Sequence, residues 1–489
     1  YCVQRANALC QQGRARQSAG DPEGAVADHD RALGLLLEGA SGGRSGLEPH
    51  RAKVHLYRGQ ARKALGDNQA ALADFEEAIT LFPADGSHAS QRARALQERA
   101  KIHLAYAGRA QGHASAMADY TEVIDSLANH PAHATERAEA HYARARIQIE
   151  EGNLEAAVAD LDQALALNPQ HPAGWFHRGV VRDRLGDRPG AAADYGRAID
   201  LVAHDAAAYY CRGKVLLDSG DAEGAVVDFS KVLALIPQDA AAYLGRGRAY
   251  ESLGDVETAV SDYSRAIVLE PQNPLVYLER GDLFTRQGEL EQAAADYGTA
   301  IILNKLDPRA YHSRGDLYCE LGQPEAAVED YGRAIELNGE DGLAHYKRAG
   351  ARSQMGDTQG AVADLDRAVA LLPVDRESGL LQEAYYQRGL AHEKQEQLEL
   401  ALADYRRAAE LDPELGAAQM QIGVLYALLG DAGRAIPHLS KAIDLEPKWL
   451  EAYRQRGFSH QAQGNYGQAV ADLSRIVKLQ PGEPLAYVD

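Results

Sequence analysis

The chain has 489 residues, of which 45% are hydrophobic and 25% charged, and its formal net charge is −20. This acidic excess argues against nucleic acid as a partner, because such binding depends on neutralising phosphates. No apolar run is long enough to cross a membrane, so no membrane insertion is expected.

A pattern of small and aromatic residues recurs along the chain with a fixed period. Within Ala240 to Gln272 it comprises Tyr243, Gly247, Tyr250, Gly254, Ala259, Tyr263 and Ala266. The same pattern returns 34 residues earlier around Gly213 and 34 residues later around Gly281. A fixed period of this length, with apolar spacing suited to two short helices, predicts a stacked repeat array.

In chain order, the counterparts of Gly247 are Gly13, Gly59, Ala100, Ala145, Gly179, Gly213, Gly281, Gly315, Ala349, Gly389, Gly423 and Gly457. They predict about thirteen repeats in a single array over residues 1–489, with a regular core at 138–373. Insertions are expected near 39–50, 84–90, 107–114 and 374–380, the third as a longer hairpin turn. Residues 484–489 resemble the start of a truncated further repeat.

The turn between the two helices of a repeat has its own signature. Gly254 suits a left-handed helix end and Asp255 suits the N-cap of the next helix. The same pair recurs as Gly66-Asp67, Gly186-Asp187, Gly220-Asp221, Gly356-Asp357 and Gly430-Asp431. Glu396 and Gln397 replace it in one repeat, so a strained or differently shaped turn is expected there.

This pattern resembles the tetratricopeptide repeat (TPR) family over nearly the entire chain. The resemblance implies an all-α, right-handed α-solenoid superhelix of two-helix repeats. It also implies a concave groove, formed by the first helices, that binds extended peptides or partner helices. One subtype of the family binds the C-terminal carboxylate of a peptide with a set of Lys, Asn and Arg side chains. The positions that match this set hold Phe176, Val180, Cys211, Ala241 and Gly245, with no Lys or Asn among them. This carboxylate-binding set is therefore absent.

An arginine and an aspartate also recur in the repeat. Arg212, Arg246 and Arg280 occupy one position, and Asp228, Asp262 and Asp296 the other. Aspartate is a poor residue for a helix interior, so a pairing role is indicated. We expect an Arg–Asp ladder between helices that contributes more to register than to net stability, because desolvation offsets the attraction. A row of catalytic carboxylates or an anion track is the alternative.

The variable face of the first helices carries the candidate partner-binding residues. Aromatic rings supply contact area and charges supply orientation. An ordinary solvated helix face is the alternative interpretation. The groove candidates are Tyr142, Phe176, Tyr210, Lys214, Arg248, Glu279, Asp282, Asp316, Tyr346 and Tyr386.

No catalytic motif or cofactor-binding loop is present, so neither enzyme activity nor a cofactor is expected. Four cysteines without a CxxC spacing indicate no zinc site, and His130, His133 and His141 are expected to be solvated loop histidines. The sequence therefore favours a scaffold that binds a protein or peptide. Two alternatives remain: a recognition arm of a larger enzyme, and a subunit that stacks head to tail with copies of itself into a filament. Stacking would use Leu9 at one end and Leu485 and Tyr487 at the other. The compartment is left open.

Overall fold

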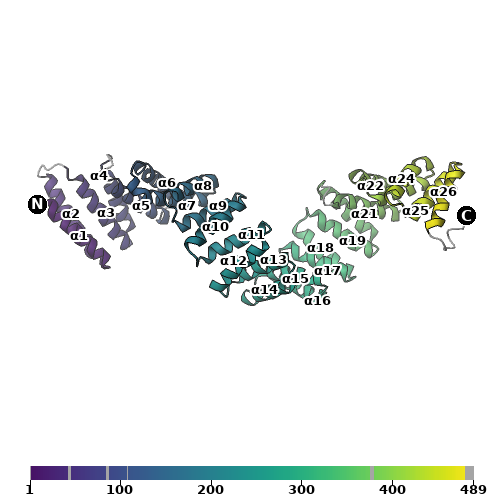
Figure 1. The fold of residues 1–489 in the computed structure, drawn as a ribbon, viewed down its shortest axis with the longest axis horizontal. Helices are drawn as coiled ribbons and strands as arrows, with labels where there is room; N and C mark the ends of the chain where they lie inside the picture. The colour runs from purple at the N-terminus through teal and green to yellow at the C-terminus, as the bar shows by residue number, and fades with distance from the viewer. Residues whose placement is uncertain (1, 42–45, 84–86, 107, 375–378, 480–489) are drawn as a thin grey trace. The chain divides into compact units, whose positions relative to one another are not determined.

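The computed structural model describes residues 2–41, 46–83, 87–106, 108–374 and 379–479. Within these ranges the regular structure consists of 26 α-helices and the short 3₁₀ helix η1 (Pro131–His133), with no strand (Figure 1). The all-α prediction is therefore confirmed.

The helices alternate between first and second helices of a repeat. The first helices are α1 (Cys2–Ser18), α3 (Glu48–Ala64), α5 (Ala89–Tyr106), α7 (Ala134–Glu151), α9 (Pro172–Arg184), α11 (Ala206–Asp218), α13 (Ala240–Ser252), α15 (Pro274–Gln287), α17 (Pro308–Glu320), α19 (Gly342–Gln354), α21 (Leu380–Lys394), α23 (Gly416–Leu428) and α25 (Leu450–Ala462). The second helices are α2 (Pro22–Ser41), α4 (Asn68–Leu81), α6 (Arg109–Ser126), α8 (Leu154–Leu167), α10 (Arg188–Leu201), α12 (Ala222–Leu235), α14 (Val256–Leu269), α16 (Leu290–Leu303), α18 (Pro324–Leu337), α20 (Thr358–Leu371), α22 (Leu398–Leu411), α24 (Ala432–Leu445) and α26 (Tyr466–Leu479).

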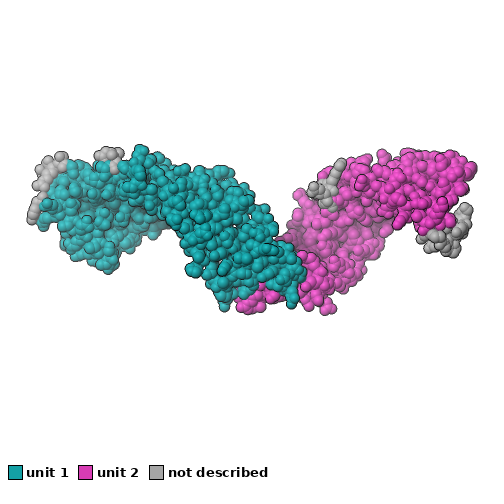
Figure 2. Space-filling model, viewed as in Figure 1, with its two compact units in different colours: residues 1–259 teal, residues 260–489 magenta. Residues whose placement is uncertain are grey.

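The chain divides into two compact units, residues 1–259 and 260–489, shown in teal and magenta in Figure 2. In unit 1, α3 packs against α4, and α4 packs in turn against α5. In unit 2, α17, α18 and α19 are related in the same way. Each repeat thus buries its apolar surface against its own partner helix and against the next repeat, as a stacked array requires.

The turns between paired helices have the geometry expected from the Gly-Asp signature. Gly66 and Gly220 adopt left-handed φ values of 81° and 86°. The carboxylate of Asp67 accepts a hydrogen bond from the backbone N–H of Ala70 at 3.1 Å, and Asp221 accepts one from Gly224 at 2.9 Å. These carboxylates satisfy N–H groups that have no partner within the helix.

The expected exception lies between α21 and α22. Glu396 takes the left-handed conformation with φ 60°, the only non-glycine residue with positive φ among the described residues. Its Cβ makes this conformation unfavourable. Gln397 follows as the N-cap residue of α22, and its side chain accepts no capping hydrogen bond. The fold imposes the standard turn on residues that do not favour it, so this turn is strained.

The small residues of the first helices lie beneath aromatic rings of the second helices. A Cβ at Gly59 would lie 2.8 Å from Cε1 of Phe75, and one at Gly281 would lie 2.7 Å from Cε1 of Tyr297. These distances are too short for even a methyl group without movement of the ring. Alanine occurs at Ala145 and Ala349, where the second helix carries the smaller Leu161 and Leu365. In these four repeats the larger first-helix residue occurs with the smaller second-helix residue, whereas Gly423 lies beneath Leu439.

The insertion at residues 107–114 differs from its expected form. We expected a longer hairpin turn, but α6 already begins at Arg109, so most of the insertion is helical. Gly112 is buried within that helix. The extra residues lengthen the hairpin of α5 and α6. Parts of the other three insertions, residues 42–45, 84–86 and 375–378, lie outside the described residues.

Candidate binding face and the arginine–aspartate ladder

The candidate partner-binding residues lie on the first helices of both units. We call them the binding face. Unit 1 contributes Tyr142 on α7, Phe176 on α9, Tyr210 and Lys214 on α11, and Arg248 on α13. Unit 2 contributes Glu279 and Asp282 on α15, Asp316 on α17, Tyr346 on α19 and Tyr386 on α21. All of them are half-buried except Lys214, which is exposed.

The aromatic residues of this face pack against rings behind them. Ring centroids are 5.6 Å apart in the edge-to-face pair of Tyr210 and Phe229, and 5.5 Å apart between Tyr386 and Tyr405. Phe176 lies similarly against Tyr195, 5.7 Å away. Contacts of this kind hold an aromatic ring in position while part of it remains accessible.

Tyr142 has a different environment, because its repeat carries Leu161 in place of a second-helix aromatic residue. Its ring stacks on His177 of α9 at 5.6 Å and lies 4.5 Å from the ring of His171. Burial lowers the pKa of His177, and the positive charge of the nearby Arg146 lowers it further.

The acidic residues of the face have partners in the core. The hydroxyl of Tyr297 donates to Asp282 at 2.7 Å, and the hydroxyl of Tyr331 donates to Asp316 at 2.6 Å. Burial raises the pKa of Asp282, and the hydrogen bond from Tyr297 partly opposes this effect. Because a buried tyrosine hydroxyl needs a hydrogen-bond partner, these carboxylates have a structural role that our sequence analysis missed. The signal was present, since each aspartate occurs in a repeat whose second helix carries tyrosine.

Among the cavities beside first helices, one in each unit is lined by a candidate tyrosine. In unit 1 a cavity of about 370 Å³ is lined by residues that include Lys101, Tyr120, Tyr142 and Arg146. In unit 2 a cavity of about 400 Å³ is lined by Tyr346, Lys347, Ala349, Gly350, Ser353, Gln354, Leu365 and Gln387. Each contains one of the tyrosines singled out from the sequence.

The recurring arginine and aspartate meet within the hairpins of both units. Arg212 donates from Nε and Nη2 to the carboxylate of Asp228 at 2.8 and 2.7 Å, and Arg280 donates in the same way to Asp296 at 2.8 Å. The same contact joins Arg58–Asp74, Arg99–Asp119, Arg144–Asp160, Arg178–Asp194, Arg314–Asp330, Arg348–Asp364, Arg388–Asp404 and Arg456–Asp472. The fork of the guanidinium matches the two carboxylate oxygens.

The remaining guanidinium nitrogen links one repeat to the one before it. In seven of the described repeats Nη1 donates to a polar side chain of the preceding repeat, two positions after its ladder aspartate or, for Ser440, after His438; for example, Arg280 donates to Ser264 at 2.9 Å. Arg246 donates to Ser230 at 3.2 Å, while Asp262 is buried. The acceptors of this kind are Asp30, Thr121, Asp162, Ser230, Ser264, Asp366 and Ser440. We define them as the link residues; they couple neighbouring repeats.

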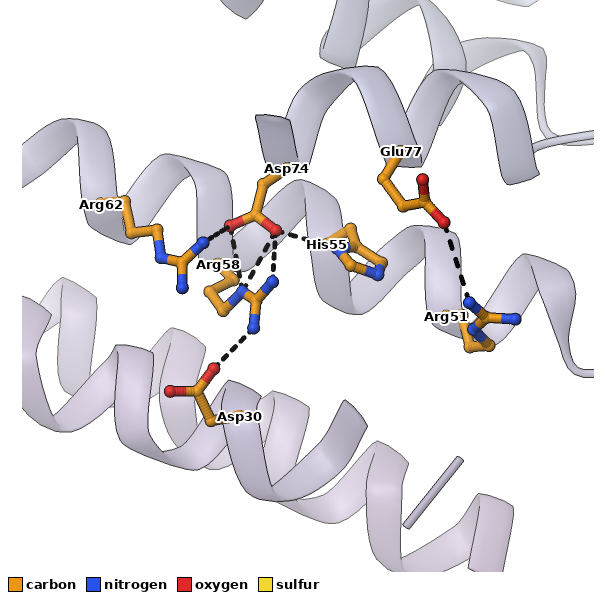
Figure 3. A network of polar contacts seen from close by, with 7 residues as sticks. All are labelled: Asp30, Arg51, His55, Arg58, Arg62, Asp74 and Glu77. Carbon is orange, nitrogen blue, oxygen red and sulfur yellow. Dashed lines mark hydrogen bonds and ion pairs between the residues drawn. The ribbon is translucent and has the colours of Figure 1, made fainter. Parts of the chain in front are cut away.

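Figure 3 shows this arrangement around Asp74 of α4. Its carboxylate accepts hydrogen bonds from Arg58 and Arg62 of α3 and contacts the ring of His55 at 2.9 Å, while Arg58 also reaches Asp30 of α2. Burial raises the pKa of Asp74, but the hydrogen bonds from His55 and Arg58 outweigh it, so this pKa lies below its ordinary value.

The ladder is altered at two places. In α1, Gln12 occupies the arginine position, and neither carboxylate oxygen of the buried Asp28 has a hydrogen-bond partner, although Arg16 lies 3.3 Å away. In the repeat of α23 and α24, buried Ile422 and half-buried His438 replace both partners. His438 contacts Gln419 instead, at 2.8 Å.

The remaining candidates are placed as follows. Leu9 is half-buried and packs into the core of α1 and α2, whereas Leu485 and Tyr487 lie outside the described residues. Nδ1 of His141 contacts Asp160 at 2.8 Å, so this histidine joins the ladder. Among the described residues, no group of three or more His, Cys, Asp or Glu could hold a metal ion. None of the described helices is long and apolar enough to span a bilayer.

Family models match the chain along much of its length. A model described as TPR repeat matches residues 247–288, 281–322 and 315–356. Models described as tetratricopeptide repeat match residues 52–85, 138–171, 178–240, 383–415 and 417–448. Together these matches cover more than half of the chain.

Solved structures of helical repeat proteins are also similar to this chain. YrrB, described as a TPR protein with an unusual peptide-binding site, is 27% identical, with 39% of this chain and 95% of that chain covered and a TM-score of 0.35. A tetratricopeptide repeat protein from Parabacteroides merdae is 19% identical, with coverages of 54% and 98% and a TM-score of 0.40. The Cut9–Hcn1 hetero-tetramer of APC/C is 14% identical, with coverages of 93% and 96% and a TM-score of 0.38. No curated protein matches the chain.

Proposed function

The chain belongs to the tetratricopeptide repeat family, and we propose that it is a non-enzymatic scaffold that holds an extended peptide or a partner protein on its binding face. The observation that carries this proposal is the row of half-buried rings on successive first helices, including Phe176 and Tyr210 in unit 1 and Tyr346 and Tyr386 in unit 2.

The packing of these rings supports a binding role. Because Tyr210 and Tyr386 already rest against core rings, little side-chain freedom remains to be lost when a partner covers them. Rigid aromatic residues of this kind contribute strongly to protein interfaces. The residues of the Arg–Asp ladder recur along the chain, whereas the residues of the binding face differ from repeat to repeat. The binding face can therefore change its residues while the ladder keeps the geometry of the repeat.

The charge of the chain supports a protein partner over a nucleic acid. A formal charge of −20 opposes the approach of a polyanion. Within the face, Lys214 and Arg248 are cationic in unit 1, whereas Glu279, Asp282 and Asp316 are anionic in unit 2. Charges of both signs orient a peptide and suppress wrong partners.

The test is a selection of random displayed peptides against the full chain, followed by affinity measurements on variants. We expect Tyr210→Ala and Arg248→Ala to weaken the selected peptides at least tenfold while circular dichroism shows that both variants remain folded. The controls are Tyr106→Ala and Arg188→Ala, at exposed positions outside the binding face. Failure to select any peptide, or equal losses in the controls, would contradict the proposal. Light scattering over a dilution series separates partner binding from stacking of the chain with itself.

A further inference from the structure

The cavity in unit 2 has an origin that can be traced by comparison with neighbouring repeats. In the two preceding repeats, an aspartate on the first helix accepts a hydrogen bond from a tyrosine on the second: Asp282 from Tyr297 and Asp316 from Tyr331. In the repeat of α19 and α20, the corresponding residues are Gly350 and Leu365. A carboxylate, a ring and its hydroxyl are thus replaced together by smaller groups.

The space left by these replacements is not refilled by other side chains. A Cβ placed on Gly350 would meet no heavy atom within 4 Å, and Gly350 is exposed. The resulting cavity of about 400 Å³ is open to the binding face beside Tyr346. Its volume is at the lower end of the range for ligand pockets, which suits a single large side chain.

The lining of this cavity mixes apolar groups with the polar side chains of Ser353 and Gln354, and two of its other polar groups already have partners. The ammonium of Lys347 donates to Asp316, so its methylene groups remain beside the cavity. The amide of Gln387 donates to Glu383 at 2.7 Å. Leu365 is buried, and the ring of Tyr346 is half-buried. An aromatic ring gains both apolar burial and ring contact at such a site.

The surroundings of the cavity are acidic. Asp316 and Glu320 lie one helical turn apart on α17; Lys347 already pairs with Asp316, so the excess negative charge on this helix comes from Glu320, which is exposed. Glu383 on α21 lies close enough to Tyr346 and Tyr386 to raise the pKa of both hydroxyls, in addition to the larger effect of burial. A peptide with positive charge next to its aromatic residue therefore complements this part of unit 2.

We propose that the cavity formed by Tyr346, Gly350 and Leu365 is the anchor site for an aromatic side chain of an extended peptide, with a lysine or arginine of that peptide beside Glu320. This inference rests on the proposed function and names the class of peptide that the face binds in unit 2.

The first test uses N-acetyl-phenylalaninamide as a probe, with N-acetyl-alaninamide for comparison, in ligand-observed NMR with the full chain. We expect the phenylalanine probe alone to bind, and Gly350→Leu to weaken it at least tenfold by filling the cavity. Gly34→Leu is the matched control, because Gly34, on α2 in unit 1, is also an exposed helical glycine whose added Cβ would meet no heavy atom within 4 Å. Circular dichroism checks that both variants are folded. Equal binding to wild type and Gly350→Leu would overturn the proposal.

The second test separates this inference from the proposed function. Peptides obtained by display selection are measured against wild type and Gly350→Leu, and their aromatic and basic residues are replaced in turn. If the anchor site is occupied as proposed, replacing the phenylalanine, tyrosine or tryptophan of a selected peptide lowers its affinity for the wild-type chain. The same replacement then leaves its affinity for Gly350→Leu unchanged. Selected peptides that bind through Tyr210 and Arg248 but are indifferent to Gly350→Leu would overturn the anchor site and leave the proposed function standing.

Discussion

Arg178 reaches back to Asp162 in the preceding repeat, with 2.6 Å between Nη1 and Oδ1, while its other two donors hold Asp194 in its own hairpin. One side chain therefore fixes both the packing within a hairpin and the register between repeats. Three repeats carry glycine at the position of the link residue, namely Gly196, Gly298 and Gly332. A Cβ at these positions would lie 3.5, 3.9 and 3.6 Å from Nη1 of the following arginine.

Gly298→Ser should stabilise unit 2 by supplying the missing link to Arg314. Ser264 shows the geometry, since its hydroxyl accepts from Arg280 at 2.9 Å. We expect a gain of about 1 to 2 kcal/mol, from helix propensity and a hydrogen bond to a charged group. Hydrogen exchange of the α16 and α17 amides measures it. Gly298→Ala is the control and should gain only the propensity part, about 0.5 to 1 kcal/mol. Equal gains would show that the link contributes nothing.

Asp74→Asn should destabilise unit 1 more than Asp119→Asn does. His55, Arg58 and Arg62 surround Asp74 and keep its pKa low against the effect of burial. Burial raises the pKa of Asp119, and Arg99 only partly opposes this. Asp74→Asn should lower the free energy of unfolding by about 3 kcal/mol, because it removes a charge that is well paired; urea unfolding near neutral pH measures this loss. A smaller loss for Asp74→Asn than for Asp119→Asn would contradict this account.

The same two aspartates predict opposite dependences on pH. Because the pKa of Asp74 is lower in the folded protein, its contribution is present above the unfolded pKa of about 4 and is lost as the pH falls through the folded pKa. The pKa of Asp119 is raised, so its contribution is greatest in acid and is lost as the pH rises through the folded pKa. Urea midpoints across this range should show a weaker acid dependence in Asp74→Asn than in wild type. An unchanged profile would show that Asp74 is not the group involved.

Glu396→Gly should relieve the strained turn between α21 and α22. Glu396 has a φ of 60°, whereas glycine occupies this conformation at Gly356 and Gly430 with φ near 79° and 78°. We expect a gain of about 1 kcal/mol in thermal or urea unfolding. Gln397→Asp should add a capping hydrogen bond of about 0.5 to 1 kcal/mol, as Asp357 provides for α20. A loss of stability in Glu396→Gly would mean that its side chain makes a compensating contact.

Gly59→Ala should destabilise unit 1, and Phe75→Leu should restore part of the loss. The new methyl group would lie 2.8 Å from the ring of Phe75, an overpacking that costs about 1 to 3 kcal/mol. The double variant reproduces the natural pair of Ala145 and Leu161. A double-mutant cycle on urea unfolding should therefore give a favourable coupling energy. Additive losses would show that the two positions are independent.

Sequence reasoning succeeded where the determining physics is local. The Gly-Asp turns follow from backbone φ preference and N-cap chemistry, and the strain at Glu396 follows from the same rule applied to a residue with a Cβ. It failed at residues 107–114, where α6 begins at Arg109 and buried Gly112 lies inside this helix, because tertiary packing can override the poor helix propensity of glycine.

By itself, the sequence determined the all-α repeat, the positions of its turns and the residue types that pair within a hairpin, because each depends on a spacing that recurs along one chain. Tertiary structure decided which of the variable side chains meet. Arg280 meets Ser264, Tyr331 meets Asp316, and the replacements at Gly350 and Leu365 open a cavity, only because packing brings particular faces of separate helices together. Such contacts depend on the direction and volume of side chains on those helices, which a period in the sequence does not encode.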